Sequence, residues 1–150
     1  MVTVTQKWDK RVGQWHEHVT SAAAFGKVLD RILDLSRPRP SDVCVDLGAG
    51  TGFVTAALAP LVASVHAVDI SAAMAEALAG RAAEAGLANV STEVIDLRDF
   101  RLPPSSADLI VSSYALHPPS GPGGLVQPDL GCGLVQPDLG WSQRLSLVTA

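Results

Sequence analysis

Apolar and polar positions along the chain predict helices and short buried strands in turn. From about His16 to Leu35 the apolar residues recur at helical spacing. The run "SRPRPSD" then ends the helix, because proline disfavours helical backbone at and before its own position. Strand signals follow at 43–47, 64–70, 89–96 and 107–116.

Helical patterns separate the first three of these strands. "FVTAALAPLV" predicts a helix weakened at Pro60, and "AAMAEALAGRAAEA" predicts a second one. Ser71 is the expected N-cap of the second helix, and Gly86 is the expected residue just beyond its end. Short strands that are apolar on both faces and separated by helices are typical of an α/β protein with a doubly wound, mostly parallel sheet.

Acidic residues and glycines gather where the predicted strands end. Asp46 and a glycine loop end the first strand, Asp69 ends the second, and Asp96 ends the third. Ligands of open α/β sheets bind at the carboxyl ends of the strands. We therefore expect a ligand site at this edge of the sheet.

The loop "VDLGAGTG", from Val45 to Gly52, is compatible with more than one nucleotide-like ligand. Gly48 and Gly50 match the first two glycines of the dinucleotide fingerprint, but Phe53 occupies the third position. Asp46 would also be an unfavourable neighbour for a diphosphate. No Gly-Lys-Ser/Thr follows, so the loop is not a Walker phosphate loop.

The spacing D-x-G-x-G-x-G, together with three later motifs, resembles class I S-adenosylmethionine-dependent methyltransferases. "AVDIS" is similar to the second motif of that family, "VIDLRDF" to the third, and "ADLIVSSYALH" to the fourth strand. The opening "KWDKRVGQWHEHV" resembles the N-terminal helix that caps the cofactor site in members acting on small molecules. The resemblance covers residues 5–117 and implies a Rossmann-like fold with S-adenosyl-L-methionine as cofactor.

The resemblance also implies roles for individual residues. Asp46 would attract the cofactor ammonium, Asp69 would accept hydrogen bonds from the ribose hydroxyls, and Asp96 would accept one from the adenine amine. Each acid also has a structural alternative, as a loop cap, a helix N-cap or a solvated turn residue. Ile70 and Met74 either hold the adenine between them or belong to the core. The expected cofactor-binding residues are Asp46, Gly48, Ala49, Gly50, Gly52, Asp69, Ile70, Met74, Asp96, Leu97 and Ser112.

No catalytic residue follows from the sequence. His117 ends the fourth strand and is either a general base or a structural histidine, and Trp8, Trp15 and Tyr114 fit either a substrate pocket or aromatic packing. His16 and His18 lack a third ligand at metal-site spacing, so no metal site is expected. Methyl transfer needs alignment of the acceptor and exclusion of water rather than a catalytic triad.

Composition and charge limit the kinds of molecule that we expect this protein to bind. The net charge of −4 gives no basic field for nucleic acid, and no apolar run is long enough to span a membrane. The N-terminus lacks the apolar core of a signal peptide, so a cytoplasmic location is expected. The expected partner is a small-molecule methyl acceptor, with neither nucleic acid nor membrane involved.

Residues 118–150 depart from the family pattern and are interpreted as an atypical tail to a core of residues 1–117, whose N-terminal capping helix is expected at 1–37. "GLVQPDLG" occurs twice there, at 124–131 and 133–140, which suggests a truncation, frameshift or local duplication. The sheet would then be incomplete relative to the seven-stranded methyltransferase fold. Its fourth strand would lie at an exposed edge and favour self-association, unless "QRLSLVT" covers it.

Two functions follow from this sequence. The first is an S-adenosylmethionine-dependent methyltransferase acting on a small molecule. The second is a catalytically inactive cofactor-binding or interaction module of methyltransferase origin.

Overall fold

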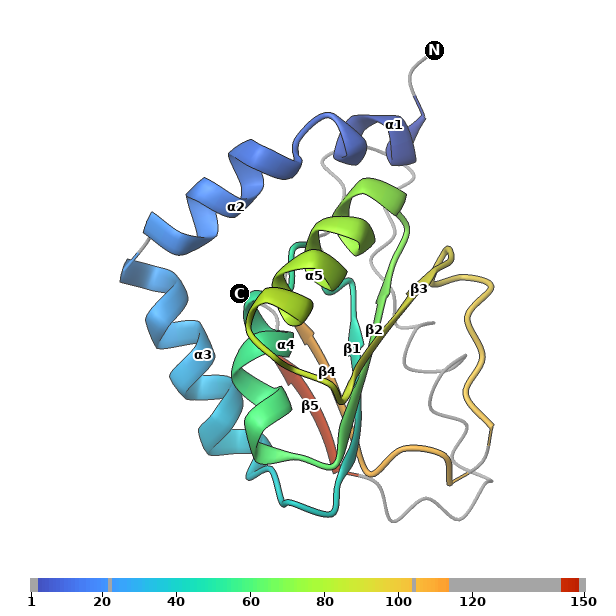
Figure 1. Cartoon of the computed structure of the whole chain (residues 1–150). Coiled ribbons are helices and arrows are strands. Elements are labelled where there is room, and N and C mark those ends of the chain that lie inside the picture. The colour runs from blue at the N-terminus through green and yellow to red at the C-terminus, as the bar shows by residue number, and fades with distance from the viewer. Residues whose placement is uncertain (1–2, 22, 104, 114–143, 149–150) are drawn as a thin grey trace, which may run out of the picture.

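A computed structural model describes residues 3–21, 23–103, 105–113 and 144–148. Five strands form one sheet in the order β3-β2-β1-β4-β5 (Figure 1). The strands are β1 (Val43–Leu47), β2 (Ser64–Asp69), β3 (Val90–Val94), β4 (Leu109–Ser113) and β5 (Arg144–Val148). All four ladders are parallel, which confirms the predicted α/β, Rossmann-like class. The strand order reverses at β1, so the carboxyl ends of β1 and β4 form the topological switch point.

Six helical segments accompany the sheet in the described residues. They are α1 (Val4–Asp9), α2 (Val12–Ser21), α3 (Ala23–Ser36), α4 (Phe53–Leu58), the 3-10 helix Ala59–Leu61 and α5 (Ala72–Glu84). The predicted single N-terminal helix is therefore three helices, the first of which starts in a Thr3–Gln6 capping box. Among the described helices, none combines the length and apolarity that a membrane crossing requires.

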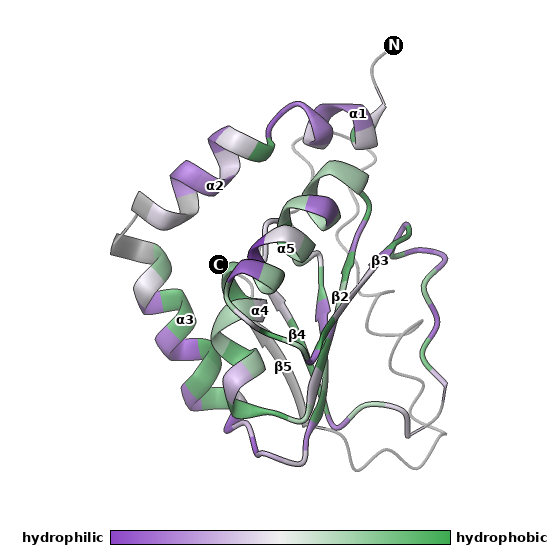
Figure 2. Cartoon of the chain, in the orientation of Figure 1, coloured by the Kyte–Doolittle hydropathy of each residue, from purple (hydrophilic) through white to green (hydrophobic). Residues whose placement is uncertain are grey.

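The core is divided between the two faces of the sheet. On one face, Ile32 of α3 and Leu58 of α4 pack against buried strand residues such as Val65, and α5 lies over β2 and β3 (Figure 1). On the other face, Phe100 and its neighbours cover Val45, Leu47, Val68 and Ile110. Figure 2 shows apolar residues prominent along α4 and β2, and largely polar helices α1 and α2.

Local capping signals predict the helix ends well. The Ser71 hydroxyl accepts a hydrogen bond from the Met74 N–H at 3.2 Å, so Ser71 is the N-cap of α5 as expected. Gly86 follows the end of α5 with a φ of 69°, the left-handed conformation expected of a C′ residue. Pro60 lies in the 3-10 helix that follows α4, in agreement with the predicted weakening at this position.

Of the two alternatives for the fourth strand, an exposed edge or cover by "QRLSLVT", the structure shows the second. β5 pairs with β4 in parallel register, from Leu109 opposite Arg144 to Ser113 opposite Val148. The suggested strand at 143–149 therefore forms and supplies the backbone partners that β4 would otherwise lack. The argument for self-association through β4 loses its basis, because β4 is an interior strand.

Gly52 is the tightest packing point between α4 and α5. It is the N-cap of α4 with a φ of 87°, and a Cβ placed there would lie 2.6 Å from Cγ of Leu78 on α5. A side chain at this position would therefore be strained by the left-handed backbone and would also push the two helices apart.

We predict that Gly52→Ala lowers the free energy of unfolding by about 2–5 kcal/mol, the sum of the left-handed strain and the overpacking. Gly80→Ala is the matched control, because Gly80 lies within α5 and a Cβ there meets nothing within 4 Å. That variant should gain about 0.5–1 kcal/mol. Urea unfolding of both variants measures the difference, and equal stabilities would contradict the packing argument.

Candidate cofactor site

The glycine loop between β1 and α4 is anchored on the neighbouring strand β2. The backbone N–H groups of Gly48 and Ala49 both donate to the carbonyl of Val68, at 2.8 and 3.0 Å. Gly48, Gly50 and Gly52 all have positive φ values, which explains why the sequence places glycine at these three positions. The loop is therefore a defined turn held against the carboxyl end of β2.

Asp69, at the end of β2, is bound to the loop and to the start of α5. Its Oδ2 accepts from the Gly50 N–H at 2.8 Å, and its Oδ1 accepts from the Ser71 N–H at 2.9 Å. Burial raises the pKa of Asp69, and these backbone hydrogen bonds oppose that shift. Each carboxylate oxygen has a second lone pair, so Asp69 can still accept hydrogen bonds from a ligand.

Asp46 lies at the other side of the loop and is fully buried. Its Oδ2 accepts from the Thr55 hydroxyl at 2.7 Å, while its Oδ1 has no hydrogen-bond partner within the described part of the chain. Burial raises the pKa of Asp46 to about 6, although the Thr55 bond acts against the shift, and the charge of Asp69 adds to it. Because Asp46 faces α4 rather than solvent, a direct contact with a ligand requires the loop to move.

Trp15 of α2 covers the loop. Its indole Nε1 lies 3.0 Å from the position that a Cβ on Gly50 would take, so a side chain there would crowd the ring as well as strain the left-handed backbone. The ring also packs edge-to-face against Trp8 at 5.7 Å and Phe25 at 6.1 Å between centroids. Trp8 and Trp15 could line a substrate pocket or pack against other aromatic rings, and these contacts are of the second kind.

Asp9 is a site residue that the sequence analysis did not identify. Its Oδ1 accepts from the Ser71 hydroxyl at 2.5 Å and from the Ala73 N–H at 3.4 Å, which joins the end of α1 to the start of α5. Asp9 also lies close enough to raise the pKa of Asp69. The contact joins residues 62 positions apart, so no local spacing could have predicted it.

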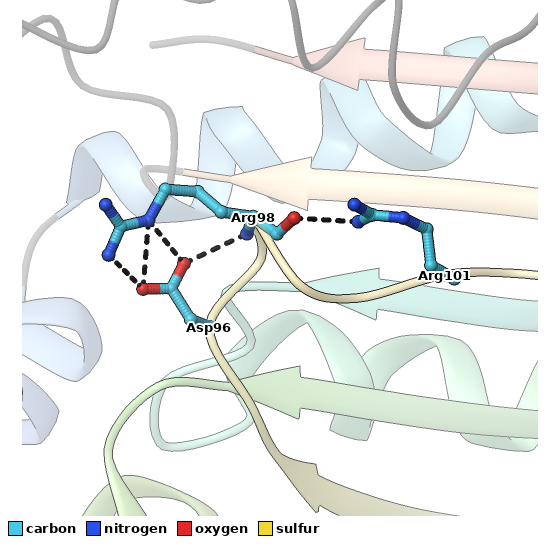
Figure 3. A network of polar contacts seen from close by, with 3 residues as sticks. All are labelled: Asp96, Arg98 and Arg101. Atoms are coloured by element: carbon cyan, nitrogen blue, oxygen red, sulfur yellow. Dashed lines mark hydrogen bonds and ion pairs between the residues drawn. The ribbon is translucent and has the colours of Figure 1, made fainter.

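Asp96, after β3, forms an ion pair with Arg98 (Figure 3). Its Oδ1 accepts from the backbone N–H and the Nε of Arg98, at 2.9 and 3.0 Å, and Arg98 Nη2 lies 2.5 Å from Oδ2. The hydrogen bonds from Arg98 lower the pKa of Asp96. Asp96 is therefore ionised at neutral pH, and a ligand at this carboxylate would share it with Arg98.

The remaining predicted residues lie in different environments. Met74 is buried in α5 and only 2% exposed, whereas Ile70 at the start of the same helix is partly exposed. Leu97 packs against the apolar cluster around Phe100, and the Ser112 hydroxyl donates to the Leu47 carbonyl at 3.0 Å. Ala49 lies in the loop itself. His117 and Tyr114 lie outside the described residues.

The residues present fit a cationic, nucleoside-like cofactor better than a diphosphate. Gly48, Gly50 and Gly52 present loop backbone without a Cβ, and the charge of the buried Asp46 carboxylate favours a positive group nearby. Asp69 offers free lone pairs beside the loop. Among the described residues, no cluster of three His, Cys, Asp or Glu side chains is placed to hold a metal ion.

Comparison with known proteins identifies the family. The sequence model of a family described as "Methyltransferase domain" matches residues 44–123, more than half of the chain. The chain therefore belongs to the methyltransferase domain family. Membership of this family implies S-adenosylmethionine as the cofactor, as the motif resemblance does.

Two curated relatives share about a third of their residues with this chain over the matched segment. Aklanonic acid methyltransferase DauC of Streptomyces sp. (strain C5) is 35% identical over 57% of this chain and 40% of its own length. Nocamycin O-methyltransferase of Saccharothrix syringae is 36% identical over 64% of this chain and 35% of its own. The chain thus spans two fifths or less of these relatives.

A solved structure supports the fold independently. A putative S-adenosyl-L-methionine-dependent methyltransferase from Methanococcus maripaludis superposes with a TM-score of 0.63, at 24% identity, over 77% of this chain and 54% of its own. The Rossmann-like architecture of this chain is therefore that of a methyltransferase domain.

We predict that Asp46 makes the protein less stable as the pH rises from about 4 to 6. The carboxyl has a pKa of about 6 in the folded protein and 3.8 in the unfolded chain, so the folded protein retains a proton that the unfolded chain releases. This difference corresponds to a loss of about 2–3 kcal/mol in the free energy of unfolding. Asp46→Asn should remove that part of the pH dependence in urea unfolding.

The control is Asp34→Asn, on the exposed face of α3, which also removes one negative charge. It should keep the wild-type slope. An Asp46→Asn protein whose stability falls as steeply as that of the wild type between pH 4 and 6 would refute the assignment.

Proposed function

We propose that this chain forms the cofactor-binding part of an S-adenosylmethionine-dependent methyltransferase that acts on a small molecule. The observation that carries the proposal is the hydrogen bond from the Gly50 N–H to Asp69 Oδ2, at 2.8 Å. It places a carboxylate with free lone pairs directly beside a glycine loop at the carboxyl edge of a parallel sheet, where such sheets bind ligands.

Different residues of the chain would then bind different parts of S-adenosylmethionine. Asp69 would accept the ribose hydroxyls, and the backbone of Gly48, Gly50 and Gly52 would lie along the methionine part. The S-adenosylmethionine sulfonium supplies a methyl group that is already activated for transfer. Trp15 would exclude water from the loop, which is how such sites protect a reactive group while holding it in line with an acceptor.

A small-molecule acceptor is supported by the relatives and by charge. The two curated relatives are named for aklanonic acid and nocamycin, the second as an O-methyltransferase. The net charge of −4 gives no attraction to a nucleic acid acceptor. We therefore propose transfer to a hydroxyl or carboxyl oxygen of an uncharged or weakly charged small molecule.

We predict that S-adenosylhomocysteine binds the whole chain and that Asp69→Ala weakens the binding about tenfold to a hundredfold. Hydrogen bonds to a charged acceptor contribute about 1.5–3 kcal/mol each, and the variant removes the acceptor for both ribose hydroxyls. Isothermal titration calorimetry measures the change. Asp34→Ala on the exposed face of α3 should bind like the wild type.

Because Asp69 also fixes the loop through Gly50, each variant needs a thermal unfolding curve at the same protein concentration. Asp69→Asn, which keeps one oxygen acceptor, should show an intermediate affinity. Absence of binding to the wild type at millimolar ligand would overturn the proposal.

A separate assay distinguishes the enzyme from an inactive binding module. Transfer of a labelled methyl group from S-adenosylmethionine to a panel of small hydroxyl and carboxyl compounds should yield methylated product, at a rate that falls in Asp69→Ala. Tight binding of S-adenosylhomocysteine with no product from any acceptor would instead support the module.

A further inference from the structure

A cavity of about 340 Å³ lies between the helical arm α2–α3 and the pair α4–α5. Figure 1 shows α2 and α3 standing away from α5, with α4 behind. The walls are largely apolar and include Leu29, Phe53, Ala57 and Leu78. Two ionisable side chains also reach the cavity, His16 of α2 and Arg81 of α5, and none of the lining residues is acidic.

This cavity is distinct from the proposed cofactor site. α5 begins beside Asp69 at the carboxyl edge of the sheet, and Arg81 follows Ser71 by ten positions. At 1.5 Å of rise per residue, Arg81 therefore lies about 15 Å along the helix from the N-cap. The two sites share only the Thr51–Gly52 end of the loop, which lines one wall of the cavity.

Arg81 brings a positive charge and an unsatisfied N–H donor to this apolar space. Its Nε–H is buried and finds no acceptor among the described residues. Burial lowers the pKa of Arg81, but a guanidinium remains charged at neutral pH, and nearby Glu84 favours the charged form. The same charge contributes to a lowered pKa of His16, after burial of the imidazole itself. A buried donor without an acceptor destabilises the protein unless a ligand satisfies it.

We propose that this cavity binds an amphipathic monocarboxylate, with the apolar chain between α3, α4 and α5 and the carboxylate on the Arg81 guanidinium. The volume lies within the range of small-molecule pockets, and the lining combines an apolar surface with one cationic group, as sites for such ligands do. Arg81 also offers a fork of N–H groups that matches the two oxygens of a carboxylate. The anion would satisfy the buried Nε–H.

Octanoate is the probe, titrated into the full chain by calorimetry, with 1-octanol as a neutral compound of equal chain length. We expect one octanoate site per chain, weaker binding of octanol, and a loss of about tenfold or more in octanoate affinity for Arg81→Gln. Arg31→Gln is the matched control, since Arg31 is exposed on α3 and does not line the cavity. Octanol affinity should be the same in the wild type and in Arg81→Gln.

A second variant tests the cavity itself. Ala57→Leu places a larger side chain in the wall and should weaken octanoate and octanol together, while thermal unfolding shows that the variant is folded. Octanoate should still bind with saturating S-adenosylhomocysteine present, because the two ligands would occupy different sites. The proposal is overturned if octanoate does not bind at millimolar concentration, if neither variant changes its affinity, or if S-adenosylhomocysteine displaces it.

Discussion

The hydrogen bond between the Gly50 N–H and Asp69 Oδ2 joins the loop after β1 to the end of β2. The arrangement of the candidate site depends on this bond. The loop after β1 makes further bonds to Val68 at the end of β2, so it is held by a neighbouring strand. The parallel register that places Leu47 opposite Val68 brings these ends together. The N-terminal helices converge on the same place, with Trp15 over Gly50 and Asp9 on Ser71.

The same glycines serve packing and ligand approach at once. Gly52 lets α4 approach Leu78 of α5, and Gly50 lets Trp15 approach the loop. A side chain at Gly52 would collide with Leu78, and one at Gly50 would crowd Trp15. The loop therefore lies in close contact with both α2 and α5.

Local signals in the sequence predicted local structure well. Ser71 and Gly86 mark the ends of α5 because capping depends on residues within one turn, and the glycine loop follows from backbone conformation alone. The strands and their parallel arrangement followed from apolar runs and intervening helices. Features that depend on tertiary contact were not predictable in this way: the contact of Asp9 with Ser71 and the orientation of Asp46 toward Thr55. The pairing of β5 with β4 was one of two alternatives for the fourth strand, and the sequence alone did not decide between them.

The electrostatics of the loop support a cationic ligand. Asp46 and Asp69 lie close enough for the charge of one to raise the pKa of the other, and Asp9 adds a third carboxylate nearby. A diphosphate would bring further negative charge to this group and would be opposed by charge repulsion, which adds to burial in raising these pKa values. An ammonium or sulfonium would instead favour the ionised carboxylates, and binding would then lower the pKa of Asp46. A ligand of this charge would stabilise the folded chain most at a pH above about 6, where the unliganded protein carries the full cost of the buried Asp46 charge.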